Sequence, residues 1–197
     1  MSPKIEAESI VDQRALRQRQ LTDAALSLAL EGGAESITVS AVAAKAGLAR
    51  SSFYEYFSSS ADLIADLVMD ELESYRLRLS KAVEDSKSSD EYIANWVEES
   101  LKYVVDGRHM LVKSLNSVTL PDFRKAEIAQ GHRALMSTII EPLANLGIKD
   151  IHAALTYLQN TLDTASTRIE AGNDAEKEID YAKRYAFAGL RALSDLP

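Results

Sequence analysis

The chain has 197 residues, a formal net charge of −8 at pH 7 and 46% hydrophobic residues, with only 4 prolines and 8 glycines. This length suits one large or two small globular domains, and the shortage of helix-breaking residues favours an all-α protein. The absence of cysteine excludes disulfides and thiol chemistry, and no apolar run approaches the roughly 20 residues of a membrane span. We therefore expect a cytoplasmic helical protein without a cofactor or metal.

The N-terminal segment, residues 1–12, is polar and lacks an apolar signal core, so it is predicted to be a flexible arm. A helix is predicted from about Val11 to Glu31, because apolar residues recur there with helical spacing, at Leu21, Ala25 and Leu28. Gly33 can end this helix in the left-handed conformation. Thr38 can then cap the next helix.

Two short helices follow, over about residues 39–46 and 50–56, and Gly47 lies between them. Phe53 and Phe57 lie one turn apart and form the apolar side of the second short helix. A short helix, a glycine turn and another short helix are the spacing of a helix-turn-helix, whose second helix enters the DNA major groove.

The remainder of the chain is predicted to form a C-terminal helical bundle. Ser58 to Ser60 break the pattern and can cap a fourth helix, whose positive N-terminal end suits Asp62. The further helices are expected at about residues 61–85, 90–105, 107–117, 122–145, 150–171 and 175–194. The fold class is therefore all-α with about nine helices, comprising a three-helix helix-turn-helix domain at residues 13–60 and a bundle at residues 61–197.

The residues around the motif form an ordered series: Leu21-Thr22-Asp23-Ala24-Ala25-Leu26, Gly33, Thr38-Val39, Val42-Ala43, Ala46-Gly47-Leu48 and Ser52-Phe53-Tyr54-Glu55-Tyr56-Phe57. This series resembles the N-terminal signature of the TetR/AcrR family of bacterial regulators over about residues 17–63, most specifically over residues 39–57. The resemblance implies a ligand-responsive transcriptional regulator, most often a repressor, that binds a palindromic operator in double-stranded DNA as a homodimer. It also implies that residues 61–197 sense the ligand and dimerise.

The resemblance also implies roles for individual residues. Ser40 occupies a phosphate-contacting position, and the recognition-helix positions are Arg50, Ser51, Ser52, Tyr54, Glu55 and Tyr56. Arg50 is the best candidate to read a guanine, because its forked guanidinium matches O6 and N7 of that base. Two roles stay open for Glu55, which can accept a hydrogen bond from cytosine or repel phosphate. The tyrosines are expected to donate hydrogen bonds to phosphates, although Tyr54 equally suits core packing.

Three positions depart from the family pattern. Ser60 stands where a lysine is usual, Ala49 replaces a capping serine, and Ala41 replaces an acidic residue. Residues 1–63 also contain six basic against eight acidic residues, so the predicted reading domain is not basic. Loss of one phosphate-binding lysine is expected to flatten the salt dependence of DNA binding by about 0.9 in slope.

The last two helices, about residues 150–171 and 175–194, are the implied dimer interface. Small residues recur along the second of them, at Ala182, Ala186 and Gly189, and can pack against a partner subunit or within the chain. Polar and aromatic residues within apolar helices are weak markers of a small-molecule pocket. These markers are Trp96, Tyr103, His109, Asn116, Tyr157 and Asn160.

The sequence also bears on two other functional classes. The acidic reading domain, Glu55 and Ser60 suit a protein-interaction module that keeps the fold without binding DNA. An enzyme is disfavoured, because the sequence contains no glycine-rich phosphate loop and no G-x-S-x-G motif, and its three histidines lack metal-ligand spacing.

Overall fold

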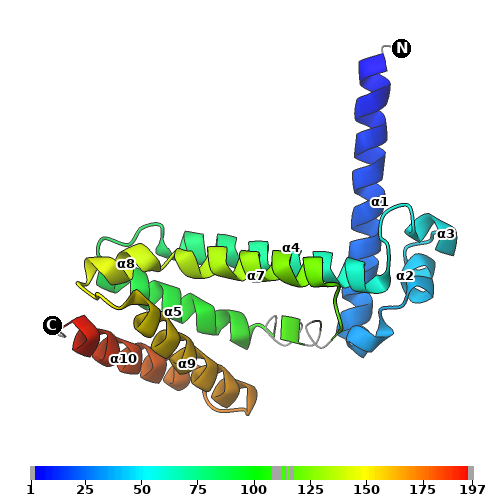
Figure 1. Cartoon of the computed structure of the whole chain (residues 1–197). Coiled ribbons are helices and arrows are strands. Elements are labelled where there is room, and N and C mark those ends of the chain that lie inside the picture. Colours follow the sequence, from blue (N-terminus) through cyan, green and yellow to red (C-terminus); the bar gives the residue numbers. More distant parts are fainter. Residues whose placement is uncertain (1–2, 108–111, 114, 116–117, 195–197) are drawn as a thin grey trace. The chain divides into compact units, whose positions relative to one another are not determined.

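The computed structural model describes residues 3–107, 112–113, 115 and 118–194, and this part of the chain contains helices and no strands (Figure 1). The predicted all-α class is confirmed. No helix in these ranges is long and apolar enough to cross a membrane. The elements are α1 Pro3–Gly32, the 3₁₀ helix η1 Ala34–Ser36, α2 Val39–Lys45, α3 Arg50–Phe53, α4 Ser60–Val83, α5 Ser89–Val105, α7 Asp122–Ser137, α8 Ile140–Asn145, α9 Ile151–Glu170 and α10 Ala175–Ser194.

The first helix differs from the prediction at its N-terminal end. Helix α1 begins at Pro3 and not near Val11, so the backbone of residues 3–12 is helical where a flexible arm was expected. Proline is tolerated at the first helical position because its missing N–H has no helical partner there. The lysine, glutamates and alanine that follow are good helix formers. The prediction was based on the polarity of the segment and did not take this helix propensity into account.

The helix predicted over residues 122–145 is wrong as a single element, because it is divided between α7 and α8 at Thr138 and Ile139. Pro142 explains the break. A continuous helix would bond the N–H of residue 142 to the carbonyl of Thr138, and proline has no N–H. The Tyr92 hydroxyl instead donates to the Thr138 carbonyl at 3.0 Å. The helix predicted at residues 107–117 lies largely outside the described residues.

The chain divides into two compact units, residues 1–71 with 111–128 and residues 72–110 with 129–197. In the first unit, α1 packs against η1 and α2, and α2 packs against α3. Its core is apolar and comes from every one of these helices and from the first turns of α4. The core includes Leu21, Ala25, Ile37, Val42, Ala43, Phe53, Phe57, Leu63, Ile64 and Val68.

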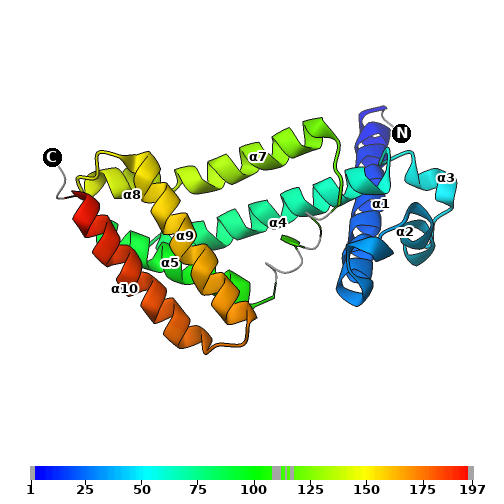
Figure 2. The same ribbon diagram turned by 60° about the horizontal axis from the view of Figure 1, so that its bottom comes forward.

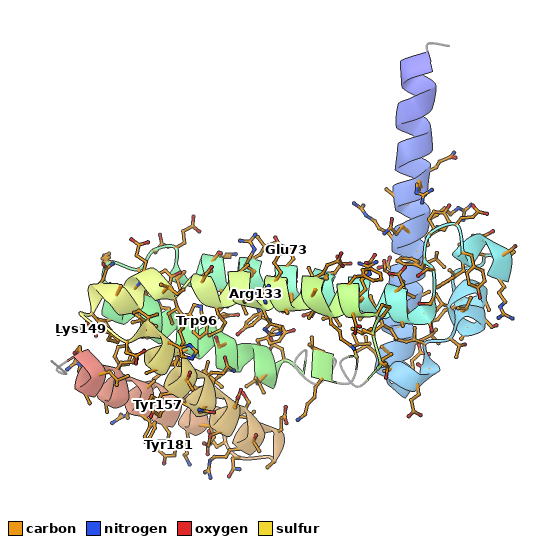
Figure 3. The ribbon with its side chains drawn as sticks, viewed as in Figure 1. Glu73, Trp96, Arg133, Lys149, Tyr157 and Tyr181 are labelled. Atoms are coloured by element: carbon orange, nitrogen blue, oxygen red, sulfur yellow. The ribbon has the colours of Figure 1, made fainter. Side chains whose placement is uncertain are left out.

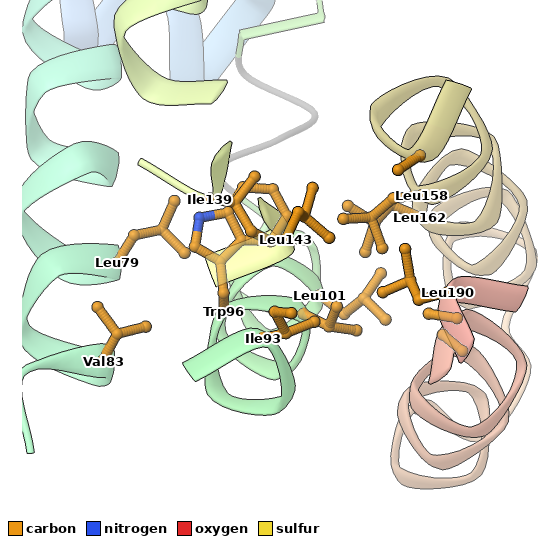
Figure 4. Close-up of a cluster of buried hydrophobic side chains, with 14 of the residues drawn as sticks. Leu79, Val83, Ile93, Trp96, Leu101, Ile139, Leu143, Leu158, Leu162 and Leu190 are labelled. Carbon is orange, nitrogen blue, oxygen red and sulfur yellow. The ribbon is translucent and has the colours of Figure 1, made fainter. Parts of the chain in front are cut away.

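Helix α5 is the centre of the second unit and contacts α8, α9 and α10, with α9 and α10 lying side by side (Figure 2). Its buried residues follow a helical stripe at Ile93, Trp96, Val97, Ser100, Leu101, Tyr103 and Val104. Figure 4 shows how Trp96 fills the space between α4 and α8. The Trp96 indole N–H donates to Thr138 Oγ1 at 3.2 Å, so its one polar atom is satisfied inside the core.

Helix α8 allows a direct test of this core. Leu143 is fully buried, whereas Ile140 on the same helix is 40% exposed. Leu143→Ala should lower the free energy of unfolding by about 2–5 kcal/mol, because it removes buried methyl groups and leaves a cavity. Urea denaturation followed by circular dichroism measures the change. Ile140→Ala is the control and should cost less than about 1 kcal/mol; equal losses from the two variants would contradict the described core.

Candidate nucleic-acid interface

The two short helices are joined by a turn that depends on one glycine. Thr38 Oγ1 accepts a hydrogen bond from the Ala41 N–H at 3.2 Å and caps α2, as predicted. At the other end of α2, Gly47 has φ +68°, and the Leu48 N–H donates to the Ala43 carbonyl at 2.9 Å. This Schellman arrangement needs a left-handed residue, which glycine adopts without a Cβ penalty. The turn therefore directs α3 away from the axis of α2.

Helix α3 is shorter than predicted. Only Arg50–Phe53 is α-helical, and Tyr54 to Tyr56 continue as a turn. The backbone N–H of Tyr56, for example, reaches the Phe53 carbonyl at 3.0 Å, three residues back. Ala49 makes no side-chain cap hydrogen bond, which agrees with the missing capping serine. Burial of Phe53 and Phe57 anchors the segment on both sides of the turn.

The predicted DNA-contacting residues lie mainly on the solvent-facing side of this segment. Phe53 and Phe57 take the inward-facing positions, while Ser52 and Tyr56 are half-buried. Within the described chain, Arg50 has no hydrogen-bond or ion-pair partner, so its guanidinium is available to an outside ligand. The exposed members of the predicted set are Ser40, Arg50, Ser51, Tyr54 and Glu55.

The sequence did not predict the role of Arg14. Its Nη2 donates to the Glu55 carbonyl at 3.0 Å, and its guanidinium lies 5.5 Å from the centre of the Tyr56 ring. A cation at this end of a helix satisfies an unpaired carbonyl and complements the helix dipole. Residues 50–57 are called the reading segment below. Arg14, on α1, therefore holds the end of this segment and packs against its Tyr56 ring. Arg14 and Glu55 are 41 residues apart in the chain, and no local sequence pattern indicates that they are in contact.

A second basic residue of this unit is also engaged. Lys45 Nζ lies 2.6 Å from Glu31 Oε1, and Ser27 donates to the same oxygen. The hydrogen bond from Lys45, followed by that from Ser27, lowers the pKa of Glu31. Lys45 and Glu31 thus neutralise each other, and Arg50 is the cation on α3 that remains unpaired among the described residues.

The predicted pocket residues that the structure describes, Trp96, Tyr103, Tyr157 and Asn160, do not come together at one place. Trp96 is a core residue, and Tyr103 is buried and stacked on Tyr75 with ring centres 4.3 Å apart. Burial raises the pKa of Tyr75 to about 12. Tyr157 and Asn160 instead face outward on α9, while His109 and Asn116 lie outside the described residues.

Tyr157 and Asn160 belong to a groove of about 760 Å³ between α9 and α10. Tyr181 and Tyr185 of α10 line the same groove, and Figure 3 shows Tyr157 and Tyr181 near each other on this surface. Arg168 and Glu178 close one side with paired hydrogen bonds of 2.7 and 2.8 Å. The groove is thus lined mainly by aromatic rings and small polar side chains.

The small residues of α10 do not all lie on one exposed face that could pack against a partner subunit. Ala182 and Ala186 are buried in the core of their own unit, whereas Gly189 is exposed. Of the two alternatives open from the sequence, the intramolecular contact holds for both alanines. The outward stripe of α10 is Tyr181, Tyr185 and Ala188.

Comparison with known proteins identifies related folds. Residues 21–67 match the family model "Bacterial regulatory proteins, tetR family". No curated protein sequence matches the chain. A TetR-family transcriptional regulator from Streptomyces coelicolor is 20% identical with a TM-score of 0.74, over 99% of this chain and 97% of that one.

Two further solved structures share the fold. The transcriptional regulator FadR from Bacillus subtilis, in complex with stearoyl-CoA, is 20% identical over 90% of this chain and 97% of its own, with a TM-score of 0.64. The superantigen PfiT is 16% identical over 86% of this chain and 95% of its own, with a TM-score of 0.73.

The Arg14 contact can be tested without any ligand. Arg14→Gln removes both the hydrogen bond to Glu55 and the contact with the Tyr56 ring, so it should lower the free energy of unfolding by about 1 kcal/mol. Amide hydrogen exchange at residues 55–57 should accelerate in parallel. Arg19→Gln makes the same charge change at an exposed position of α1 and should leave both measurements unchanged. Slow exchange retained at residues 55–57 in Arg14→Gln would rule out the contact.

Proposed function

Because the chain belongs to the TetR family of bacterial regulatory proteins, we propose that it is a ligand-responsive transcriptional repressor that binds a palindromic operator as a homodimer. The observation that carries the proposal is the unpaired, solvent-facing Arg50 at the start of α3. Arginine bonded to O6 and N7 of guanine is the commonest specific contact in the major groove. The exposed hydroxyls of Ser40 and Ser51 are suited to the flanking phosphates.

The first unit contains the reading segment and is called the reading unit below. Its distribution of charge affects how it binds DNA. Lys45 is paired with Glu31, Arg14 is held against Tyr56, and Ser60 replaces the usual lysine. The pairing of Lys45 and the absence of a lysine at position 60 each remove one cation that could displace counterions from DNA, so non-specific binding is weaker and depends less steeply on salt. Glu55 strengthens this effect, since its exposed carboxylate repels phosphates of the wrong register.

The groove between α9 and α10 supports the homodimer. Tyr157, Tyr181 and Tyr185 expose large parts of their rings within one groove, and aromatic residues are enriched at protein interfaces. A second copy of the same surface related by a two-fold axis covers these rings in both subunits. A homodimer carries two copies of the first unit, one for each half-site of a palindrome.

The effector is a small molecule bound by the second unit. This part of the proposal is supported by FadR, a similar fold that holds stearoyl-CoA. A ligand of this kind regulates DNA binding only by as much as its affinities for the two arrangements of the protein differ. The second unit and the ligand it binds therefore set the signal to which the reading unit responds.

A protein-interaction module is the second candidate, because the reading unit is acidic and the superantigen PfiT has a similar fold. The two functions differ in their dependence on Arg50. A regulatory effect that survives loss of the Arg50 guanidinium would favour the protein-interaction module.

Arg50→Ala tests the DNA-binding proposal. Fluorescence anisotropy with DNA from upstream of the protein's own gene should show a dissociation constant raised by about 10- to 100-fold, the cost of one lost base contact. Arg133→Ala removes a surface arginine of the second unit and serves as the matched control, with no expected change. Absence of binding by the wild-type protein at micromolar concentration and low salt would refute the proposal.

Tyr185→Asp tests the dimer. Tyr185 is 74% exposed in the single chain, so the change should leave the fold intact while placing a charge in the proposed interface. Sedimentation should show a dimer for the wild-type protein and a monomer for the variant at the same concentration. Leu77→Asp alters a residue of α4 that is 55% exposed and lies outside the groove, and it should remain dimeric. A dimer that persists in Tyr185→Asp places the interface elsewhere.

A further inference from the structure

Arg124, in the first turn of α7, is the hub of a partly buried ion network in the first unit. Its Nε and Nη2 both bind one oxygen of Asp62, Oδ1, at 2.7 and 2.5 Å. Its Nη1 lies 3.0 Å from Asp66 Oδ1 and 2.9 Å from Glu127 Oε2. The Arg124 side chain is 19% exposed and that of Asp62 12%. The described contacts therefore commit this guanidinium to carboxylates of its own chain.

The second oxygen of Asp62 continues the network to the end of the reading segment. Asp62 Oδ2 accepts hydrogen bonds from the backbone N–H and from the hydroxyl of Ser58, both at 3.0 Å. Ser58 directly follows Phe57, the buried residue that ends the reading segment. The Asp62 N–H donates in turn to Ser59 Oγ at 3.1 Å, which caps α4. Asp62 thus binds Arg124 through Oδ1 and Ser58, the residue that follows the helix-turn-helix, through Oδ2.

Helix α1 joins the same network through Asp66. Gln18 Nε2 donates to Asp66 Oδ2 at 3.4 Å, and Gln18 lies one turn from Arg14, which holds the Glu55 carbonyl. Arg124 is therefore connected to the reading segment by two routes, through Ser58 and through α1. Both routes begin at carboxylates on one face of α4.

Arg124 is the cation that the described contacts place against Asp62 and Asp66 on one face of α4. Asp62, Asp66 and Asp70 recur every four residues along α4. Burial raises the pKa of Asp66 and, with the nearby Asp66 charge, that of Asp70. Burial acts in the same direction on Asp62, but the hydrogen bonds from Ser58 and Arg124 outweigh it and lower the Asp62 pKa. Without Arg124 these carboxylates repel one another, and Asp62 is no longer held toward Ser58.

We propose that Arg124 is a positioning residue for DNA recognition: it fixes Asp62, Asp62 fixes Ser58, and the direction in which residues 50–57 present Arg50 follows from that anchor. Arg124 acts from α7, outside the helix-turn-helix, and does not touch DNA. The inference rests on the DNA-binding function proposed above, but its first step concerns the free protein alone.

The experiment compares Arg124→Gln and Arg124→Lys with Lys125→Gln. Lys125 is adjacent on α7, and its side chain is 56% exposed and paired with an exposed Asp122, so it is a matched control for charge. Amide hydrogen exchange at Ser58 is measured in the free protein, and DNA affinity is measured at several salt concentrations. All measurements are made below the melting onset of each variant.

Arg124→Gln should accelerate Ser58 exchange at least tenfold and raise the DNA dissociation constant about tenfold. The slope of log affinity against log salt should stay unchanged, because no phosphate contact is lost. Arg124→Lys keeps the charge but not the fork, so it should restore part of both effects. Lys125→Gln should behave as the wild type.

Asp62→Asn gives an independent variant if Arg124→Gln does not fold. Its single carbonyl oxygen can serve Ser58 or Arg124 but not both, so the same losses are expected. Unchanged Ser58 exchange in a folded Arg124→Gln protein would overturn the proposal, as would faster exchange with unaltered DNA affinity. A salt slope reduced by about 0.9 would show that Arg124 binds phosphate directly. If the wild-type protein binds no DNA, the function proposed above fails, while Ser58 exchange still decides whether Arg124 holds the anchor.

Discussion

Helix α3 has four residues, from Arg50 to Phe53, and a helix of that length cannot maintain itself in water because its nucleation cost is never recovered. Its conformation and direction must be imposed from outside. Phe53 and Phe57 fasten it to the core, the Gly47 turn sets its start, and Arg14 binds the carbonyl of Glu55 near its end. The orientation of the Arg50 guanidinium is therefore a property of the whole first unit.

This dependence explains how an acidic protein can be suited to DNA. Lys45 pairs with Glu31, and Arg14 is held against the Glu55 carbonyl and the Tyr56 ring, so these two basic side chains near the motif stabilise the protein itself. For the DNA-binding function proposed above, affinity is expected to come from a small number of well-placed contacts more than from net charge. Phosphate attraction carries no sequence information, whereas base contacts do, so the proposed function predicts weak non-specific binding together with sequence discrimination.

The second unit follows a different rule, since it is organised by one central helix. The apolar stripe of α5 is covered by α8, α9 and α10, and the Pro142 break lets α8 turn onto that stripe. The Tyr92 hydroxyl donates to the Thr138 carbonyl, which the helix break leaves without a helical N–H partner, and the Trp96 indole N–H donates to the Thr138 hydroxyl. The polar atoms at the break are therefore satisfied within the core. Because the inner faces of α9 and α10 pack against α5, their tyrosines lie on the outer face.

Local sequence signals predicted the all-α class, the Thr38 cap and the glycine turn correctly, but not the N-terminal extent of α1, the short α3 or the break between α7 and α8. The Thr38 cap, the glycine turn and the spacing of Phe53 and Phe57 each act within a few residues, so they can be interpreted without knowing the fold. The resemblance to the TetR/AcrR signature made Arg50 the candidate base reader, and the structure leaves its side chain exposed. The local signals did not predict the contacts of Arg14 and Arg124 or the complete burial of Trp96. They also did not predict that the alanines of α10 face the core while its tyrosines face solvent. Each of these depends on which distant helix supplies the neighbour, and side-chain type along one helix carries no information about that neighbour until the chain has packed.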